Sequence, residues 1–491
     1  MMQRQIRRVG IGLIALFVAV FAQLNYIQIF AAERIARNPA NALNLIRQYS
    51  IKRGTILTRD GKVMAVSRPT RGRLKYLRTY PEGELYGHLT GYVSVAAGAR
   101  FGLEAGFDEQ LLGDNSVLSM QDIEDRLFGG GKRGDDIQTT IDSRLQEVAR
   151  TALGDNRGAV VAMDPSTGEV RAMWSNPSYD PTPISQHDST AAQEAYEALD
   201  PSSSKSPLVN IATTNRYPPG STFKVLTGAA ALESGRYKPD STFEDPLALD
   251  LPLTTNVLRN FSRSTCAGGG DITLFHAMTI SCDTTFGELG LEIPRDIFHM
   301  AGDMAFNEEI PFDIATIASI YPDIPDDEAP LRAYAAIGQG DTSATPLQMA
   351  LVAATVANDG VVPRPRLVRQ IYDPSGGISD RFSPSSLGRA MSPETAQETT
   401  EMMESVVAEG TGTAAQIPGV SVAGKTGTAQ TVQGQNPHTW FISFAPAQDP
   451  KIAVAVIVEH GGAFGSEATG GAVAAPIAKQ ILEADRSIDG W

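Results

Sequence analysis

The sequence predicts an α+β fold in which helices are arranged around an antiparallel sheet. Three apolar segments near the C-terminus, residues 420–432, 438–445 and 451–459, follow one another with only short turns between them. Strands that are joined by short turns pair antiparallel. The chain then ends in a helical segment over residues 472–484. Helices that are segregated from an antiparallel sheet define the α+β class.

Length and composition describe a globular protein with several domains. The 491 residues correspond to about three domains of ordinary size. The chain has 42% hydrophobic and 20% charged residues, which is ordinary for a folded protein. The formal net charge of −15 argues against a nucleic-acid-binding protein, whose binding face would be basic.

The N-terminus has the pattern of a membrane anchor. Residues 1–8 contain three arginines, and an apolar stretch with few polar interruptions follows over residues 9–31. This length suffices for a bilayer span of about 20 residues. Arginines ahead of the span predict a cytoplasmic tail and a body outside the plasma membrane. A cleaved signal peptide is the alternative, because the purest apolar core covers only residues 9–22. We expect an uncleaved, single-pass anchor.

A mixed region follows the anchor, and we expect it to form a separate domain over residues 32–150. Residues 53–65 form two short apolar segments around Asp60-Gly61, which predicts a hairpin. A glycine-rich run at residues 129–134 indicates a flexible joint. We place the boundary beyond this joint, so that a second domain covers residues 151–491.

The start of the second domain alternates helix and hairpin. Apolar residues at helical spacing predict a helix over residues 142–153. Residues 158–163 and 169–174 flank an Asp-Pro-Ser-Thr-Gly turn and predict a second hairpin. Further along, a Gly/Pro turn at residues 217–220 opens into a helix that runs to about residue 235.

Ser221 and Lys224 lie in the first turn of that helix. Residues three apart share a helix face, so the hydroxyl and the amine would lie side by side. A serine becomes a nucleophile when a neighbouring base takes its proton. A lysine can be that base if burial or a nearby positive charge keeps it partly unprotonated. The alternative is a structural one, with Ser221 as the N-cap and Lys224 in solvent.

A second group of polar residues lies on the first of the C-terminal strands. Glycines flank the lysine and threonines there, and glycine permits a ligand to approach the backbone closely. A lysine would supply a fixed cation and the threonine hydroxyls would bind a carboxylate. The backbone N–H of Thr428, with that of Ser221, could hold a developing oxyanion. An ordinary hairpin strand with an exposed lysine is the alternative. The candidate binding residues are Lys425, Thr426, Gly427 and Thr428.

Ser281 and Asp283 lie between these two groups, after a helical segment over residues 274–280. Ser281 could relay a proton, as general acid–base groups do. The two cysteines, Cys266 and Cys282, are an even number in a chain that faces an oxidising space, which permits a disulfide worth about 3 kcal/mol. Two separate buried thiols are the alternative.

Neither a metal nor a cofactor is expected. The six histidines lack the spacings of a metal site. A serine nucleophile that is activated by a lysine requires no metal.

Three motifs occur in one order: Ser221-x-x-Lys224, Ser281-x-Asp283 and Lys425-Thr426-Gly427, with 60 and 144 residues between their first members. This arrangement resembles the motif set of penicillin-binding proteins and serine β-lactamases. Further segments resemble the pedestal and transpeptidase domains of class B penicillin-binding proteins, and the cysteine pair resembles actinobacterial members. The anchor, the large N-terminal region and the length argue against a secreted β-lactamase. These further segments are residues 53–56, 60–61, 102–104, 158–165, 176–177, 338–340, 346–350 and 438–441.

The resemblance implies a penicillin-binding, β-lactamase-like transpeptidase domain, preceded by a membrane anchor and an elongated pedestal or dimerisation domain. It implies a D,D-transpeptidase that cross-links peptidoglycan stem peptides of a lipid-linked precursor polymer. Ser221 would attack the penultimate D-alanine carbonyl and expel the terminal D-alanine, and β-lactams would acylate the same serine. Lys224 would be the base and Ser281 the proton relay. The implied partner is a membrane glycosyltransferase of the shape, elongation, division and sporulation type.

One residue departs from the family pattern. Asp283 stands where the family has asparagine, whose amide would donate to the substrate carbonyl, whereas an ionised aspartate only accepts. Asp283 could pair with Lys224, be protonated, or leave the substrate to the backbone. We expect Asp283→Asn to retain acylation.

Two other functions fit parts of the pattern. A β-lactam sensor would need a cytoplasmic signalling part, and only the first eight residues lie inside. A scaffold of a cell-wall synthesis complex, whose own catalysis is dispensable, would be compatible with the change at Asp283.

Overall fold

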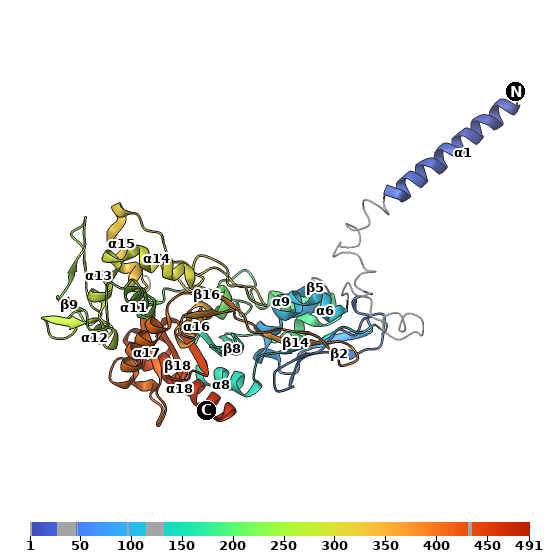
Figure 1. Ribbon diagram of the computed structural model, residues 1–491. Coiled ribbons are helices and arrows are strands. Elements are labelled where there is room, and N and C mark those ends of the chain that lie inside the picture. Colours follow the sequence, from blue (N-terminus) through green and yellow to red (C-terminus); the bar gives the residue numbers. More distant parts are fainter. Residues whose placement is uncertain (1, 27–45, 47, 96–97, 114–131, 431–434) are drawn as a thin grey trace.

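The computed structural model describes residues 2–26, 46, 48–95, 98–113, 132–430 and 435–491. Helix α1 (Met2–Asn25) stands apart from the body in Figure 1. Its segment Arg4–Asn25 is long and apolar enough to cross a membrane, and none of it is buried. The end of the expected anchor, residues 27–31, lies outside the described residues.

The pedestal is built on a six-stranded sheet, which occupies the end of the body nearest α1 in Figure 1. The predicted hairpin around Asp60-Gly61 is present as two antiparallel strands, and the first of them also pairs parallel with the strand that directly follows the glycine-rich run. Two strands from beyond residue 360 complete the sheet, so it combines segments from both sides of the expected boundary at residue 150. Its strand order is β15 (Ile378–Arg381), β14 (Val368–Tyr372), β6 (Asp136–Thr139), β1 (Ile56–Leu57), β2 (Val63–Pro69) and β3 (Tyr76–Thr79).

A buried ion cluster joins this sheet to the helices α5 (Gly102–Gly106) and α6 (Asp108–Leu112). Glu104 accepts from the Nε atoms of Arg53 and Arg78, each at 2.5 Å. All three side chains are almost fully buried. Buried charges are tolerated when they are paired and hydrogen-bonded, so the cluster fixes the helices against the sheet.

The second domain contains a five-stranded antiparallel sheet. The three C-terminal strands predicted from the sequence are neighbours in it, and the second predicted hairpin forms its other edge. The first of them is shorter than the predicted 420–432, and residues 431–434 lie outside the described part. The strand order is β17 (Ala423–Ala429), β18 (His438–Ala445), β19 (Ile452–Val458), β7 (Gly158–Met163) and β8 (Val170–Asn176).

Both faces of this sheet are covered by helices. Alternate side chains of a strand point to opposite faces. Ala453, Ala455 and Ile457 of β19 lie in the apolar core that includes helices α16 (Pro346–Ala357), which packs on β19, and α11 (Lys224–Glu233). The residues between them lie in a second core with α18 (Gly470–Asp489), which packs on β19, and α8 (Ser143–Leu153), which packs on β8. A strand that is buried on both faces must be continuously apolar, which explains the run Ile-Ala-Val-Ala-Val-Ile-Val in β19.

The predicted helices are present with small changes at their ends. Helix α8 begins after Asp142, whose carboxylate accepts from the backbone N–H groups of Arg144 and Leu145 and caps the helix. The turn before α11 is a 3₁₀ helix, η4 (Gly220–Phe223). The predicted segment 274–280 is α12 (Leu274–Thr279), and α13 (Asp283–Glu292) follows it directly. The last helix extends further in both directions than the predicted 472–484.

The remaining described strands and helices complete the two domains. The other strands are β4 (Tyr92–Ser94), β5 (Gly98–Arg100), β9 (Thr242–Glu244), β10 (Leu249–Asp250), β11 (Val257–Leu258), β12 (Asp271–Thr273), β13 (Val361–Pro363) and β16 (Ser386–Arg389). The other helices are η2 (Gly83–Leu85), α4 (Gly87–Thr90), η3 (Thr182–Ser185), α9 (Ser189–Glu197), α10 (Ile211–Thr214), α14 (Pro294–Asp303), η5 (Asp326–Glu328), α15 (Ala329–Ala336), α17 (Pro393–Ala408), η6 (Thr413–Ala415) and η7 (Glu459–Glu467).

Candidate active site

The three motifs meet at one place, where the start of α11, the turn between α12 and α13, and strand β17 come together. Ser281 lies at the centre of the group. Its Oγ atom accepts from the Nζ atom of Lys224 at 3.3 Å and from the Nζ atom of Lys425 at 2.8 Å. Side chains far apart in the sequence thus surround one hydroxyl group.

Glycines allow the Ser221 turn to pack directly on β17. A Cβ atom at Gly427 would lie 2.8 Å from the carbonyl oxygen of Pro219, and one at Gly220 would lie 3.0 Å from that of Thr428. Gly220 also has a φ of +54°, which favours glycine. We expected a ligand to make the close approach at Gly427, but in the structure the chain itself makes it. The backbone segments of Ser221 and Thr428, the expected oxyanion pair, are therefore neighbours.

Two long-range contacts hold the turn before Ser221, and neither has a local signal in the sequence. The Trp440 indole donates to the Pro218 carbonyl oxygen at 3.0 Å, and the Gly220 N–H donates to that of Gly338 at 2.9 Å. The partners of the indole contact are 222 residues apart in the chain. These contacts fix the start of η4 from two sides.

Ser221 is half-buried, and within the described part of the chain its hydroxyl makes no hydrogen bond. It does not cap the helix, because the N-cap positions of η4 and α11 are Pro219 and Phe223. The structural alternative for Ser221 is therefore wrong. The hydroxyl is left for a reacting group.

Lys224 is fully buried, so its expected alternative position in solvent is also wrong. Its Nζ atom donates to the Ser281 carbonyl oxygen at 2.7 Å, to Ser281 Oγ and to Asp283 Oδ1 at 2.6 Å. A lysine ammonium has three donors, and these contacts use all of them. The structure thus represents a state in which Lys224 is held by the second motif rather than by Ser221.

Burial lowers the pKa of both lysines. Burial lowers the pKa of Lys224, while the Asp283 carboxylate beside it acts in the opposite direction. Burial and the positive charge of Lys224 hold the pKa of Lys425 well below its usual range, again against the effect of Asp283. The Phe286 ring lies under Lys224, with its centre 5.6 Å from Nζ. Burial of this kind is how proteins keep a lysine available as a base.

Ser281 has a left-handed backbone conformation, with a φ of +64°. This conformation is uncommon for a residue with a side chain and is found at functional sites. It arises where α12 ends: the Ser281 N–H donates to the Met278 carbonyl oxygen and the Cys282 N–H to that of Ala277. The turn aims the Ser281 hydroxyl between the two lysines.

The threonines of the third motif contact neighbouring elements. Thr426 is nearly buried, and its hydroxyl lies 2.6 Å from that of Thr411. The Thr428 hydroxyl accepts from the Gly470 N–H at 3.3 Å, at the start of α18. Lys425 is fully buried rather than exposed as in the hairpin alternative. Sequence reasoning did not single out Thr411, because no motif contains it.

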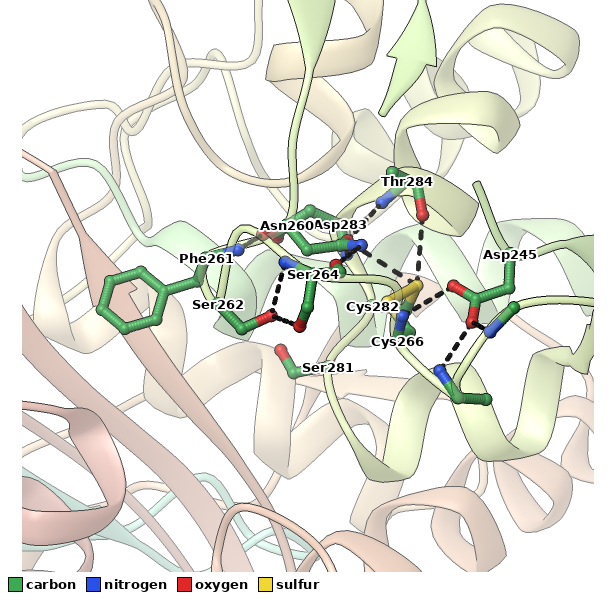
Figure 2. Close-up of a disulfide and its surroundings, with 12 residues drawn as sticks. Asp245, Asn260, Phe261, Ser262, Ser264, Cys266, Ser281, Cys282, Asp283 and Thr284 are labelled. Atoms are coloured by element: carbon green, nitrogen blue, oxygen red, sulfur yellow. Dashed lines mark hydrogen bonds between the residues drawn. A yellow bond between two sulfur atoms is a disulfide. The ribbon is translucent and has the colours of Figure 1, made fainter. Parts of the chain in front are cut away.

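Figure 2 shows the surroundings of Asp283 and of a disulfide between Cys266 and Cys282, with an S–S distance of 2.07 Å. Asn260 Oδ1 accepts from the backbone N–H groups of Asp283 and Thr284, at 2.9 and 3.1 Å, and so caps α13. Asn260 belongs to none of the three motifs and could not be selected from the sequence. Both sulfur atoms are used in the disulfide, which removes the cysteines as metal ligands.

Comparison with known proteins adds to this geometry. The sequence profile of the penicillin-binding protein transpeptidase domain matches residues 158–483, and that of the penicillin-binding protein A dimerisation domain matches residues 53–137. The chain is 40% identical to the peptidoglycan D,D-transpeptidase PbpA of Mycolicibacterium smegmatis, over 98% of this chain and 99% of that protein. It is 37% identical to PbpA of Mycobacterium tuberculosis, over 98% and 99% of the two chains.

Solved structures of penicillin-binding protein A have a similar fold. The fold superimposes on penicillin-binding protein A from M. tuberculosis in its ceftriaxone acyl-enzyme complex, with a TM-score of 0.84 and 36% identity, over 89% of this chain and 99% of that chain. The penicillin G acyl-enzyme complex of the same protein gives a TM-score of 0.82 at 36% identity, over 89% and 100% of the two chains.

Proposed function

Because this chain belongs to the class B penicillin-binding proteins, we propose that Ser221 forms the acyl-enzyme of a peptidoglycan D,D-transpeptidase. The protein cross-links stem peptides, and β-lactams acylate it. The observation that carries the assignment of residues is the position of Ser281 Oγ, which lies within hydrogen-bond distance of Lys224 and Lys425 beside the Ser221 turn.

In the acylation step the Ser221 oxygen attacks the penultimate D-alanine carbonyl carbon. Lys224, in its neutral form, takes the hydroxyl proton as general base. The new carbon–oxygen bond gives a tetrahedral intermediate, whose oxyanion the N–H groups of Ser221 and Thr428 stabilise. The bond to the terminal D-alanine nitrogen then breaks, and a proton that passes through Ser281 completes the leaving amine.

In the second step the amine of a neighbouring stem peptide attacks the ester carbonyl carbon. Its nitrogen forms the new amide bond, its proton returns through Ser281 and Lys224, and Ser221 leaves with its hydroxyl restored. A β-lactam reaches the same ester when Ser221 opens its ring, but the amine stays attached to the acyl group.

The third motif holds the terminal carboxylate of the donor peptide. Lys425 contributes its charge, and the hydroxyls of Thr426 and Thr428 contribute hydrogen bonds to the carboxylate. The supporting observation is that the Thr426 and Thr411 hydroxyl oxygens lie 2.6 Å apart. Only one of the two hydroxyls donates in this hydrogen bond, so the other keeps its hydrogen for a ligand. Gly427 acts through packing, since it lets β17 approach the Ser221 turn.

The N-terminal helix supports a membrane anchor, in line with the membrane-bound family. We propose a cytoplasmic N-terminus from the arginines at positions 4, 7 and 8, with the catalytic domain outside. The resemblance to class B proteins also supports the expected division into residues 1–8, 9–31, 32–150 and 151–491. It supports a membrane glycosyltransferase of the shape, elongation, division and sporulation type as the partner, docked on the pedestal.

One observation favours a second candidate, a scaffold whose own catalysis is dispensable. Asp283 lies 2.6 Å from Lys224 and favours its protonated form, which is not a base. The scaffold function predicts slow or absent acylation in a folded protein.

The test is to incubate the full-length protein in detergent with a fluorescent penicillin and to follow the label over time. We expect a stable adduct with the natural protein and none with Ser221→Ala. Ser234→Ala, at the far end of α11, is the matched control and should be labelled normally. Rapid release of the label would indicate β-lactam hydrolysis instead. A folded natural protein that takes up no label would support the scaffold.

A further inference from the structure

The Asp283 side chain joins two parts of the active-site region. Its Oδ1 atom accepts from Lys224 Nζ at 2.6 Å, and its Oδ2 atom accepts from the Phe261 backbone N–H at 3.0 Å. Both oxygens therefore face donors that belong to this chain. The side chain is only 14% exposed, which leaves little of it for a substrate.

The chemistry at this position requires two acceptors. A carboxylate offers two oxygens, whereas the asparagine of the family offers one oxygen and an NH₂ group that only donates. With asparagine here, the NH₂ group would face either the Lys224 ammonium or the Phe261 N–H. One donor would then lie against another, and the cost is large where that donor is the buried Lys224 ammonium rather than the exposed Phe261 N–H.

We infer that Asp283 is a positioning residue that fastens the Phe261 segment to Lys224 and sets the pH range in which Ser221 is acylated, rather than a ligand of the substrate. The inference rests on the proposed function, because it concerns the base of that reaction. It replaces the substrate-binding role that the family pattern implies for this position.

A second carboxylate holds the other end of the same segment. Asp245 accepts from the backbone N–H groups of Cys266, Ala267 and Gly269, at 2.7, 2.6 and 3.0 Å. In Figure 2 Asp245 lies on one side of the disulfide, while Phe261 lies on the other with its ring pointing away from it. The two aspartates thus fasten the two ends of one loop, but only Asp283 also touches a catalytic lysine.

The charges around Lys224 give the direction of the pH effect. In the described part of the chain, the charged side chains that face Lys224 are Asp283 from α13 and Lys425 from β17; Ser281 and the Phe286 ring are neutral. The negative charge keeps the proton on Lys224, and acylation requires that this proton be absent. Removal of the carboxylate therefore moves the onset of acylation to lower pH.

The experiment compares Asp283→Asn with Asp245→Asn as a matched control. The rate of acylation by a fluorescent penicillin is measured from pH 6 to pH 10 on full-length protein in detergent. We expect the rising limb of the Asp283→Asn profile to lie about 1–3 pH units below that of the natural protein. We expect Asp245→Asn to leave the limb in place. Hydrogen exchange of the Phe261 amide should be faster in Asp283→Asn only.

Two other results are informative. If Asp283→Asn slows acylation equally at every pH and leaves the limb in place, Asp283 is a substrate ligand and the inference is overturned. If the natural protein itself takes up no label, the proposed function fails instead. Should Asp283→Asn not fold, as judged by circular dichroism, Asp283→Ser also lacks the charge and carries the same expectation.

Discussion

The Nζ atom of Lys425 lies 2.8 Å from the Oγ atom of Ser281, and this hydrogen bond joins strand β17 to the turn before α13. Lys425 also donates to the Thr426 carbonyl oxygen at 3.1 Å. Ser281 accepts from Lys224 as well, so it lies between the base and the cation of the carboxylate site. A proton that leaves Lys224 can reach the leaving amine only if such a relay connects the two.

Removal of the relay should slow acylation without unfolding the protein. We expect Ser281→Ala to reduce the rate of acylation by benzylpenicillin by about 10²–10⁴-fold, the usual contribution of a general acid–base group. Ser443→Ala is the control, because the Ser443 hydroxyl is buried in β18 and has no partner among the described residues. A Ser281→Ala rate close to that of the control would assign the relay to another group.

The stability of the protein should depend on the titration of Lys425. Burial and Lys224 hold its pKa well below the usual range, so once the pH exceeds that lowered pKa the folded chain loses a proton that the unfolded chain still binds. Stability then rises with pH between the folded pKa and the unfolded value of about 10.4. We expect Lys425→Met to lack this rise. The melting temperature of the natural protein, relative to that of the variant, should therefore increase from pH 7 to pH 10. Lys451→Met, at a half-exposed lysine, should show no such divergence.

Much of the fold followed from local sequence patterns. The β17–β18–β19 meander and the hairpin of β7 and β8 are joined by short turns, so each strand pairs with its neighbour in the chain. The pairing of the pedestal with β14 could not be predicted in this way. Gln138 of β6 and Gln370 of β14 are 232 residues apart, yet their side chains are hydrogen-bonded. Local patterns contain no information on which distant strand fills a sheet edge.

The residues of the candidate site likewise fall into those that the sequence predicts and those that it does not. Ser221, Lys224 and Lys425 could be selected because their motifs are short and their order is specific. The partners of Asp283 could not be, since Phe261 contributes a backbone N–H that any residue except proline would offer. Gly427 was selected for the right physical property, close approach, but the approaching group is Pro219 of the same chain. The sequence thus predicted which side chains take part in the chemistry, whereas the groups that they contact could be identified only in the folded structure.

The disulfide should stabilise the protein through its unfolded state. It closes a segment of 16 residues, which corresponds to about 3 kcal/mol in the chain-entropy treatment. We expect reduction to lower the free energy of unfolding by roughly this amount, measured with urea in the presence and absence of a reductant. The Cys266→Ala, Cys282→Ala double variant contains no cysteine and should not respond to the reductant. An equal response of both proteins would show that the reductant acts elsewhere.

Disruption of the buried cluster of Arg53, Arg78 and Glu104 should destabilise the pedestal. Burial alone would raise the pKa of Glu104, but the charges and hydrogen bonds of Arg78 and Arg53 outweigh it and lower that pKa. Glu104→Gln leaves the buried Arg78 guanidinium without a counter-charge, while Arg53 keeps its ion pair with Asp108. We expect a loss of about 3–5 kcal/mol in the free energy of unfolding. Because the pKa of Glu104 is lower in the folded protein than in the unfolded chain, its contribution to stability is fully present above about pH 4.5. That contribution is lost as the pH falls through the lowered pKa.

Glu109→Gln, on the exposed side of α6, is the matched control and should change stability by less than about 0.5 kcal/mol. Because Glu104 lies in the pedestal and the three motifs lie around β17, folded Glu104→Gln protein should still be acylated at Ser221. Urea unfolding and penicillin labelling of the same samples separate the two effects. Equal stability of the two variants would mean that the pedestal does not depend on the cluster. Lost labelling in folded Glu104→Gln would mean that the pedestal controls the geometry of the active site.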